Sequence, residues 1–295
     1  MMPPRDLLTL RVKDTSLQFI DNQPLIYFEH FCCVSLSFFY NFALMIDEAI
    51  KGFKPITLEE MAGVKLMNRV DTKYVVHISK LKELLSMAKD RYFIQEIDGE
   101  SNLPYYTCYY DTPEADMYYQ HQRGKKTRQK IRRRVYEGSD TPPFLEIKSK
   151  NNKGRTKKKR REMEEGTGIP DYSEFVESQS QYLTEELQPV IENHFYRITL
   201  VNHEMTERIT IDTNLEFHNL ITGDSATLPE ICVIEWKRDG NALHTPLKEL
   251  LRELRIHEGS FSKYCIGMAL TNPLLPRNRI KKKIRNIEKI SGRFF

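Results

Sequence analysis

Cysteine is scarce in this 295-residue sequence, and the few present follow no ligand or disulfide pattern. The five are Cys32, Cys33, Cys108, Cys232 and Cys265. Their odd number, without CxxC or zinc-finger spacing, excludes a disulfide framework and a structural zinc site. We interpret them as reduced core thiols and expect a cytoplasmic location.

The motifs of several large enzyme classes are also missing. The eight histidines show no HExxH spacing, and no serine or cysteine lies in a nucleophile elbow. The GKKT sequence at residues 124–127 resembles the end of a P-loop, but Tyr119 stands where the upstream glycine is required. Zinc proteases, α/β-hydrolases and P-loop NTPases are therefore disfavoured.

One long apolar run, residues 25–46, has the length of a membrane span. It contains Glu29, His30 and Asn41, lacks a basic flank on its N-terminal side, and has no signal-peptide features. We treat residues 1–44 as an N-terminal extension. Three interpretations stay open: a membrane anchor, an extra packed helix, or a non-native extension before a functional start at Met45.

Charge is distributed unevenly along the chain. The net charge is only +4, yet residues 123–161 hold 17 Lys/Arg against three acids, a local charge of +14 that leaves −10 for the rest. Residues 276–295 form a basic C-terminal tail. A segment this basic on an otherwise mildly acidic chain indicates a polyanionic partner.

Helix and strand signals alternate along the chain and predict an α+β fold. Helices are expected at residues 57–67, 79–88 and 171–193, and a further one begins at Thr245-Pro246, an N-cap followed by an N1 proline. Strands are expected at residues 68–77, 105–110, 128–136, 144–150, 198–211 and 231–237.

The most informative pattern is the parity of the charges. Alternate residues of a strand face the same side, so Arg128, Lys130, Arg132 and Arg134 share one face while Ile131 lies on the other. Four other strands repeat this pattern with the charged sets Arg69/Asp71/Lys73, Glu146/Lys148/Lys150, Arg208/Asp212 and Glu235/Lys237. An open sheet with its charges in water explains one such strand, but it explains five less well.

A barrel with these charges inside would crowd cations together and require an anion with many oxygens. Phosphate fits, because arginine binds it bidentately and lysine adds point charge. The interspersed Glu146 and Glu235 would then be available to a divalent metal, which bridges carboxylate and phosphate oxygens.

Eight ordered motifs resemble the VTC domain, the catalytic domain of the vacuolar transporter chaperone polyphosphate polymerases, within the CYTH-like triphosphate tunnel metalloenzyme superfamily. They are Arg69–Tyr74, Tyr109–Thr112, Lys130–Arg134, Phe144–Lys150, Lys158–Arg160, Arg208–Asp212, Ile234–Lys237 and Ser262–Tyr264. The resemblance implies a closed antiparallel eight-stranded β-barrel tunnel with helices packed outside, and we place this domain at residues 45–275.

The implied activity is transfer of the γ-phosphate of ATP to a growing polyphosphate chain, with Mn²⁺ or Mg²⁺ as cofactor. Arg132, Arg134 and Arg208 are the expected catalytic residues, since a guanidinium stabilises the charge of a transferring phosphoryl group. Glu235 and, second, Glu146 are the expected metal ligands. The expected substrate-binding residues are Lys73, Lys130, Lys148, Lys158, Arg160, Lys237 and Lys263.

Two alternatives stay open: a triphosphatase or other phosphate-transfer enzyme on the same tunnel fold, and a non-catalytic nucleic-acid-binding module. Superfamily hydrolases carry Glu-x-Glu-x-Lys in the first strand, whereas this chain has Arg69-x-Asp71-x-Lys73, which favours holding anions over holding metals. The expected partners are ATP and polyphosphate, with no specific nucleic acid. Product export would need a membrane-protein partner, and membrane association is the alternative to a purely cytoplasmic location.

Overall fold

The computed structural model describes residues 8–12, 15–20, 23–24, 45–61, 64, 69–153, 155–240 and 245–295. The chain divides into two compact units, Met1–Ile46 and Asp47–Phe295. In the first unit, β1 (Leu8–Val12), β2 (Thr15–Ile20) and β3 (Gln23–Pro24) form an antiparallel sheet. Apart from its last two residues, the apolar run at 25–46 lies outside the described residues. No helix of the described part is long and apolar enough to cross a bilayer.

The second unit is α+β, as predicted, and is built on one large, mainly antiparallel sheet. Its strands follow the order β10-β9-β8-β7-β11-β12-β14-β5-β15. Their bounds are β5 (Arg69–His77), β7 (Asn102–Asp111), β8 (Arg128–Tyr136), β9 (Phe144–Lys150), β10 (Thr156–Glu162), β11 (Gln188–Asn202), β12 (Glu207–Asn219), β14 (Ile231–Asp239) and β15 (Glu258–Gly259). Off this path, β13 (Ser225–Leu228) pairs with β12, β6 (Tyr92–Gln95) with β11, and β4 (Lys54–Ile56) in parallel with β6.

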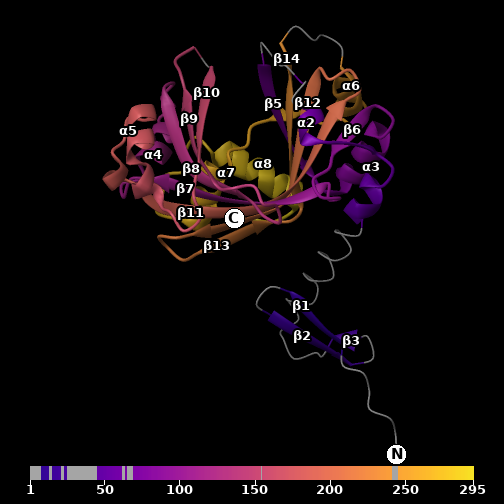
Figure 1. The fold of residues 1–295 in the computed structure, drawn as a ribbon, viewed down its shortest axis with the longest axis horizontal. Helices are drawn as coiled ribbons and strands as arrows, with labels where there is room; N and C mark the ends of the chain where they lie inside the picture. Colours follow the sequence, from indigo (N-terminus) through magenta and orange to yellow (C-terminus); the bar gives the residue numbers. More distant parts are fainter. Residues whose placement is uncertain are drawn as a thin grey trace, which may run out of the picture. The chain divides into compact units, whose positions relative to one another are not determined.

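The sheet bends into two arms. Strands β8, β9 and β10 rise on one side, β5, β12 and β14 rise on the other, and β7 and β11 run along the base between them (Figure 1). Among the described residues the predicted barrel is not closed, because β10 pairs only with β9. Every residue of β10 is exposed, and residues 157–161 are five consecutive cations. This strand offers no buried apolar contact that would offset charge repulsion on closure.

Helices cover the outside of both arms. Helix α3 (Ser79–Ala88) packs against β5 and against α6 (Pro246–Glu253), and α4 (Asp116–Gln122) packs against β7 and β8. The predicted helix start at Thr245-Pro246 is confirmed. Two shorter helices are α2 (Leu58–Met61) and α5 (Ser173–Gln179).

The helix predicted at residues 171–193 is wrong in its second half. Helix α5 ends at Gln179, and β11 begins at Gln188. Strand β11 pairs with β7 on one side and β12 on the other. Pairing along both edges of a central strand outweighs the local sequence preference.

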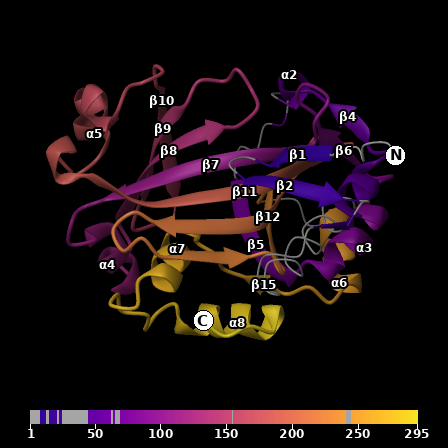
Figure 2. The same ribbon diagram turned by 90° about the horizontal axis from the view of Figure 1, so that it is seen from below.

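Helix α7 (Lys263–Thr271) lies between the arms, and α8 (Lys281–Ser291) follows it (Figures 1 and 2). A Cβ atom added to Gly267 would lie 2.5 Å from the Phe217 ring and 2.7 Å from the Ile191 side chain, so only glycine lets α7 approach the sheet this closely. Helix α8 buries Ile280, Ile284 and Ile287, an apolar stripe at helical spacing. The core therefore fixes the start of α7 beside the charged strands.

Candidate active site on the charged face of the sheet

Cross-strand register collects the charged residues of the first arm into rows. Lys130 on β8 lies opposite Lys148 on β9, which lies opposite Lys158 on β10. The next row is Arg132, Glu146 and Arg160. Since directly paired residues project to the same side of a sheet, these side chains share one surface.

The second arm continues this surface. Lys73 on β5 lies opposite Glu235 on β14, which lies opposite Thr210 on β12, and Lys237 lies opposite Arg208. We name the combined surface the charged face. Its ionised members are Asp71, Lys73, Lys130, Arg132, Arg134, Glu146, Lys148, Lys158, Arg160, Arg197, Arg208, Asp212, Glu235, Lys237 and Lys263.

Electrostatics links the two arms across the charged face. Burial lowers the pKa of Lys148 to about 8, and Arg132 of the same arm adds to the effect. Glu235 and Lys73 of the opposite arm also act on Lys148. Charges on separate strands interact this way only when they lie near each other in a poorly solvated region. An anion between the arms would therefore feel cations from both.

Glu146 is the most enclosed carboxylate of the first arm, with only 1% of its side chain exposed. Its oxygens bind the guanidinium of Arg132 at 2.6 Å and the ammonium of Lys158 at 2.8 Å. Burial alone would raise the pKa of Glu146, but Arg132, Arg134 and Lys158 outweigh it and hold the pKa far below its ordinary value. Glu146 thus stays ionised and holds two cations in place.

Asp212 has the same role at the base of the face. It accepts two hydrogen bonds from Arg197, at 2.6 and 2.8 Å, and a short one from Lys263 on α7. Burial would raise the pKa of Asp212, but Arg197 and Lys263 keep it far below its ordinary value. This contact pins the first residue of α7 to β12.

Glu235 is the third carboxylate. It lies 3.0 Å from the ammonium of Lys237 and 3.7 Å from that of Lys73. Burial would raise the pKa of Glu235, and Lys73 and Lys237 hold it well below its ordinary value. Glu146, Asp212 and Glu235 are therefore each shared between two cations, and the cations of the face still outnumber its carboxylates, including Asp71 opposite Lys237.

Arg134 is a buried cation of the charged face with an unsatisfied hydrogen-bond donor. It is only 7% exposed, and its buried Nε has no hydrogen-bond partner among the described residues. Burial, followed by repulsion from Arg132, lowers its pKa. The guanidinium lies 5.7 Å from the centre of the Tyr105 ring, and that of Arg132 lies 5.9 Å from Tyr109. Aromatic faces support both arginines; Arg132 already donates to Glu146 and to the Tyr109 hydroxyl, whereas the Nε of Arg134 remains for a ligand.

The start of α7 completes the face. Ser262 caps the helix by accepting a hydrogen bond from the Cys265 amide, and its hydroxyl also accepts one from Lys130 at 2.7 Å. Burial lowers the pKa of Lys130 to about 8, and Lys73 and Arg132 contribute through repulsion. A helix N-terminus adds partial positive charge here.

Arg197 and the aromatic residues are the members that sequence parity missed. One strand was predicted over residues 198–211, where the structure has the end of β11, a turn and the start of β12, and Arg197 fell outside it. A signal was present: the hairpin that pairs Val201 with Arg208 also pairs Arg197 with Asp212. Tyr105 was predicted only as part of a strand and Tyr109 only as part of that strand and of a motif, although they face Arg134 and Arg132.

The carboxylates of the face suit a metal only when phosphate oxygens complete the ligand set. No group of three or more His, Cys, Asp or Glu side chains gathers within the described part of the chain. Glu235, however, lies opposite Thr210, whose hydroxyl is buried without a hydrogen-bond partner there. One carboxylate, one hydroxyl and substrate phosphates form an all-oxygen set that a hard cation such as Mg²⁺ accepts.

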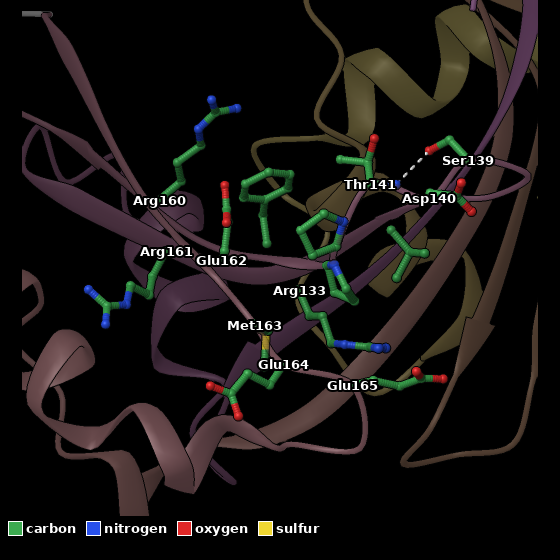
Figure 3. A pocket seen from close by; sticks show the side chains of 14 residues that line it. Arg133, Ser139, Asp140, Thr141, Arg160, Arg161, Glu162, Met163, Glu164 and Glu165 are labelled. Atoms are coloured by element: carbon green, nitrogen blue, oxygen red, sulfur yellow. Dashed lines mark hydrogen bonds between the residues drawn. The ribbon is translucent and has the colours of Figure 1, made fainter. Parts of the chain in front are cut away.

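A cavity of about 1110 Å³ opens elsewhere, beside the β8–β9 loop (Figure 3). Arg133 on the outer side of β8 and Arg160 of the charged face line it together with Arg161. Four carboxylates, Asp140, Glu162, Glu164 and Glu165, outnumber these three cations by one. A nearly neutral lining attracts a polyanion less than the cation-rich charged face does. The charged face, not this cavity, is therefore the candidate active site.

Comparison with known proteins gives one family and several distant structures. The family model described as VTC domain matches residues 68–272. No curated protein matches the sequence.

Three solved structures show likeness at low identity. A putative adenylate cyclase from Bacillus halodurans has 13% identity and a TM-score of 0.43 over 66% of this chain and 96% of that one. A putative adenylyl cyclase from Hippeastrum, described as having a dominant triphosphatase activity, has 17% identity and a TM-score of 0.46 over 70% and 98%. A protein from Pyrococcus horikoshii has 15% identity and a TM-score of 0.38 over 68% and 98%.

Proposed function

The chain belongs to the VTC domain family, and from this premise we propose that it is a polyphosphate polymerase. In the proposed reaction, a terminal oxygen of the polyphosphate chain attacks the γ-phosphorus of ATP. The bond between that phosphorus and the β,γ-bridging oxygen breaks, ADP leaves, and the chain grows by one phosphate. The supporting observation is the charge balance of the charged face, where cations outnumber the carboxylates and Glu146, Asp212 and Glu235 are each already shared between two cations.

This balance suits chain handling, because a long polyanion needs many cations while hydrolysis on two metals needs many carboxylates. The acceptor oxygen of a phosphate chain is already ionised at neutral pH, so the reaction needs no general base. The protein then has to align donor and acceptor and stabilise the charge of the transferring group.

We assign the alignment to the lysines of both arms and the charge stabilisation to the arginines. Lys130 and Lys148 on one arm and Lys73 and Lys237 on the other would hold the donor and acceptor phosphates. Arg134, with a buried Nε that lacks a partner among the described residues, would donate hydrogen bonds to the transferring phosphoryl group. We assign Arg132 and Arg208 to the same role, and Lys158, Arg160 and Lys263 to phosphate binding.

Glu235, with Thr210, would hold Mn²⁺ or Mg²⁺ together with phosphate oxygens, and Glu146 is the second candidate. When bound, such a cation neutralises phosphate charge and polarises the bond that breaks. The closed tunnel belongs to the same proposal: a polyanion on the charged face would relieve the repulsion that keeps the two arms apart. We further propose that residues 45–275 form the catalytic domain and that export of the product requires a membrane-protein partner.

The test is incubation of the protein with ATP and Mn²⁺, with the products resolved by size. Polymer together with ADP supports the polymerase. Free phosphate or tripolyphosphate without polymer would identify a triphosphatase, and no turnover with salt-sensitive nucleic-acid binding would identify a binding module. ADP in place of ATP is the matched control, because it lacks the phosphoryl group that is transferred.

A further inference from the structure

A second cavity, of about 750 Å³, lies where the strands of the first arm end. It is lined by the end of the β9–β10 hairpin, residues 149–151 and 155–157, by residues 127–129 at the start of β8, and by residues 178–181. Four cations line it: Arg128, Lys150, Arg155 and Lys157. The lining contains no carboxylate. We name this cavity the mouth pocket.

The mouth pocket differs from the charged face in one respect that matters for binding. No ion pair engages its four cations among the described residues, whereas the charged face holds three shared carboxylates. Its polar framework is fixed by Gln129, which donates to Ser149 at 2.8 Å and to the Gln179 carbonyl at 3.1 Å, and accepts from the Gln181 amide at 2.9 Å. Cations without carboxylates on a fixed polar frame favour an anionic ligand.

The pocket meets the charged face at the end of the strands. Arg128 lies opposite Lys150, and the neighbouring same-face row on the same strands is Lys130 opposite Lys148. Two residues along a strand separate these rows, about 7 Å. A phosphate chain held by Lys130 and Lys148 therefore meets Arg128 and Lys150 next. Gln129, Ser149 and Lys157 lie opposite one another and project to the other side of the sheet, so the chain reaches Lys157 by turning around the strand ends.

From this continuity we infer that the mouth pocket is an outer subsite for the oligophosphate segment that leaves the charged face. The inference rests on the proposed function for the identity of the chain. The pocket geometry and charge are independent of whether the protein transfers phosphate. The occupant is the distal part of a long chain, and a free short oligophosphate is the competing source of the same chemistry.

The test compares the triple variant Lys150→Gln/Arg155→Gln/Lys157→Gln with the control Lys51→Gln/Lys54→Gln/Lys82→Gln, which removes the same charge from exposed positions outside the pocket. Binding of long-chain polyphosphate and of inorganic tripolyphosphate is measured by calorimetry. We expect the pocket variant to bind the long chain about tenfold more weakly and the short one within twofold of wild type, since tripolyphosphate is held by the charged face. The control should leave both affinities within twofold of wild type.

Two results would overturn the inference: an unchanged long-chain affinity in the pocket variant, or equal weakening in the pocket and control variants. Loss of a second tripolyphosphate site in the pocket variant would instead assign the pocket to a free ligand. These measurements need no turnover. Absence of polymer from ATP with selective loss of long-chain binding would reject the polymerase but keep the subsite. Polymer formation from ATP, together with unchanged long-chain binding in the pocket variant, would keep the polymerase but reject the subsite.

Discussion

Arg197 on β11 and Asp212 on β12 face each other across a hairpin, and two hydrogen bonds of 2.6 and 2.8 Å join guanidinium to carboxylate. Lys263 from α7 reaches the same carboxylate. The side chains of Asp212 and Arg197 are 4% and 13% exposed, so water does little to screen them. One carboxylate thus holds a strand and a helix at the charged face.

Replacing this carboxylate should expose its role in stability. In Asp212→Asn, Arg197 and Lys263 lose their counter-charge in a buried position, and we expect the free energy of unfolding to fall by about 3 kcal/mol. Urea denaturation measures this change. Tripolyphosphate should raise the melting temperature of the variant more than that of wild type, because phosphate supplies negative charge to the two cations.

The exposed pair Arg91–Glu249 provides the control, since its side chains are 46% and 60% exposed. Glu249→Gln should change the free energy of unfolding by less than about 1 kcal/mol. The low pKa of Asp212 also sets a pH window: its stabilisation is present above the ordinary value of 3.8 and is lost as pH falls through the folded pKa. Equal acid sensitivity of wild type and Asp212→Asn below pH 4 would contradict this role.

Sequence parity predicted the charged face because the period of a strand is local. Once residues 128–136 are extended, Arg132 and Arg134 must share a side, whatever the rest of the fold. The same argument holds for Glu235 and Lys237. The start of α6 was predictable for a similar reason, since Pro246 in its first turn is a local signal, although the Thr245 side chain makes no capping hydrogen bond.

The features that the sequence could not predict depend on pairing between strands that are far apart in the chain. The register between β11 and β12 shifts between His194 and Tyr196, and parity read from one strand does not cross such a bulge. Phe195 lies within this shift, and its ring contacts Lys263, whose carboxylate partner Asp212 also binds Arg197. Closure of the sheet likewise depends on pairing between two strands that are far apart in sequence, and no local sequence pattern predicts that pairing.

Neighbouring arginines on β8 give a sharp test of the active site. Arg134 lies on the charged face, whereas Arg133 lies on the opposite side of the strand and lines the cavity of Figure 3. We expect Arg134→Ala to lower kcat by roughly a hundredfold or more, because it removes donors aimed at the transferring group. Arg133→Ala should stay within about threefold of wild type.

Both variants lose one cation from the same strand, so their net charge is matched. Circular dichroism and melting temperature should show that each is folded. Comparable losses of activity in the two variants would place the chemistry elsewhere.

The lowered lysine pKa values predict proton uptake on binding. The pKa of Lys130 is about 8, as are those of Lys148 and Lys237, each lowered first by burial. Phosphate favours the charged form and raises these pKa values, so at pH 8 to 9 the protein should take up protons as tripolyphosphate binds. At pH 6 these lysines are already charged, so they should take up no protons when tripolyphosphate binds.

The affinity for tripolyphosphate should therefore fall as pH rises from 7 to 9, because the lysines lose their charge while the phosphates are already ionised in this range. Calorimetry in buffers of different ionisation enthalpy measures the protons directly. Lys130→Arg is the control, since its guanidinium remains charged throughout and should reduce the uptake while keeping the affinity at pH 7. Unchanged uptake in this variant would show that Lys130 is not among the titrating groups.

Metal binding should depend on phosphate, because Glu235 is bound by two lysines, lies opposite the Thr210 hydroxyl, and belongs to no group of three or more metal-ligating side chains among the described residues. We expect electron paramagnetic resonance titration to show Mn²⁺ bound at least tenfold more tightly with tripolyphosphate present than without it. Glu235→Gln should remove most of this enhancement and abolish turnover. Thr210→Val should weaken the metal without affecting tripolyphosphate affinity in the absence of Mn²⁺. The control variant Glu59→Gln removes an exposed carboxylate that is distant in sequence from Glu235 and should leave the enhancement intact. Tight Mn²⁺ binding to the protein alone would show that carboxylates, rather than substrate oxygens, make the site.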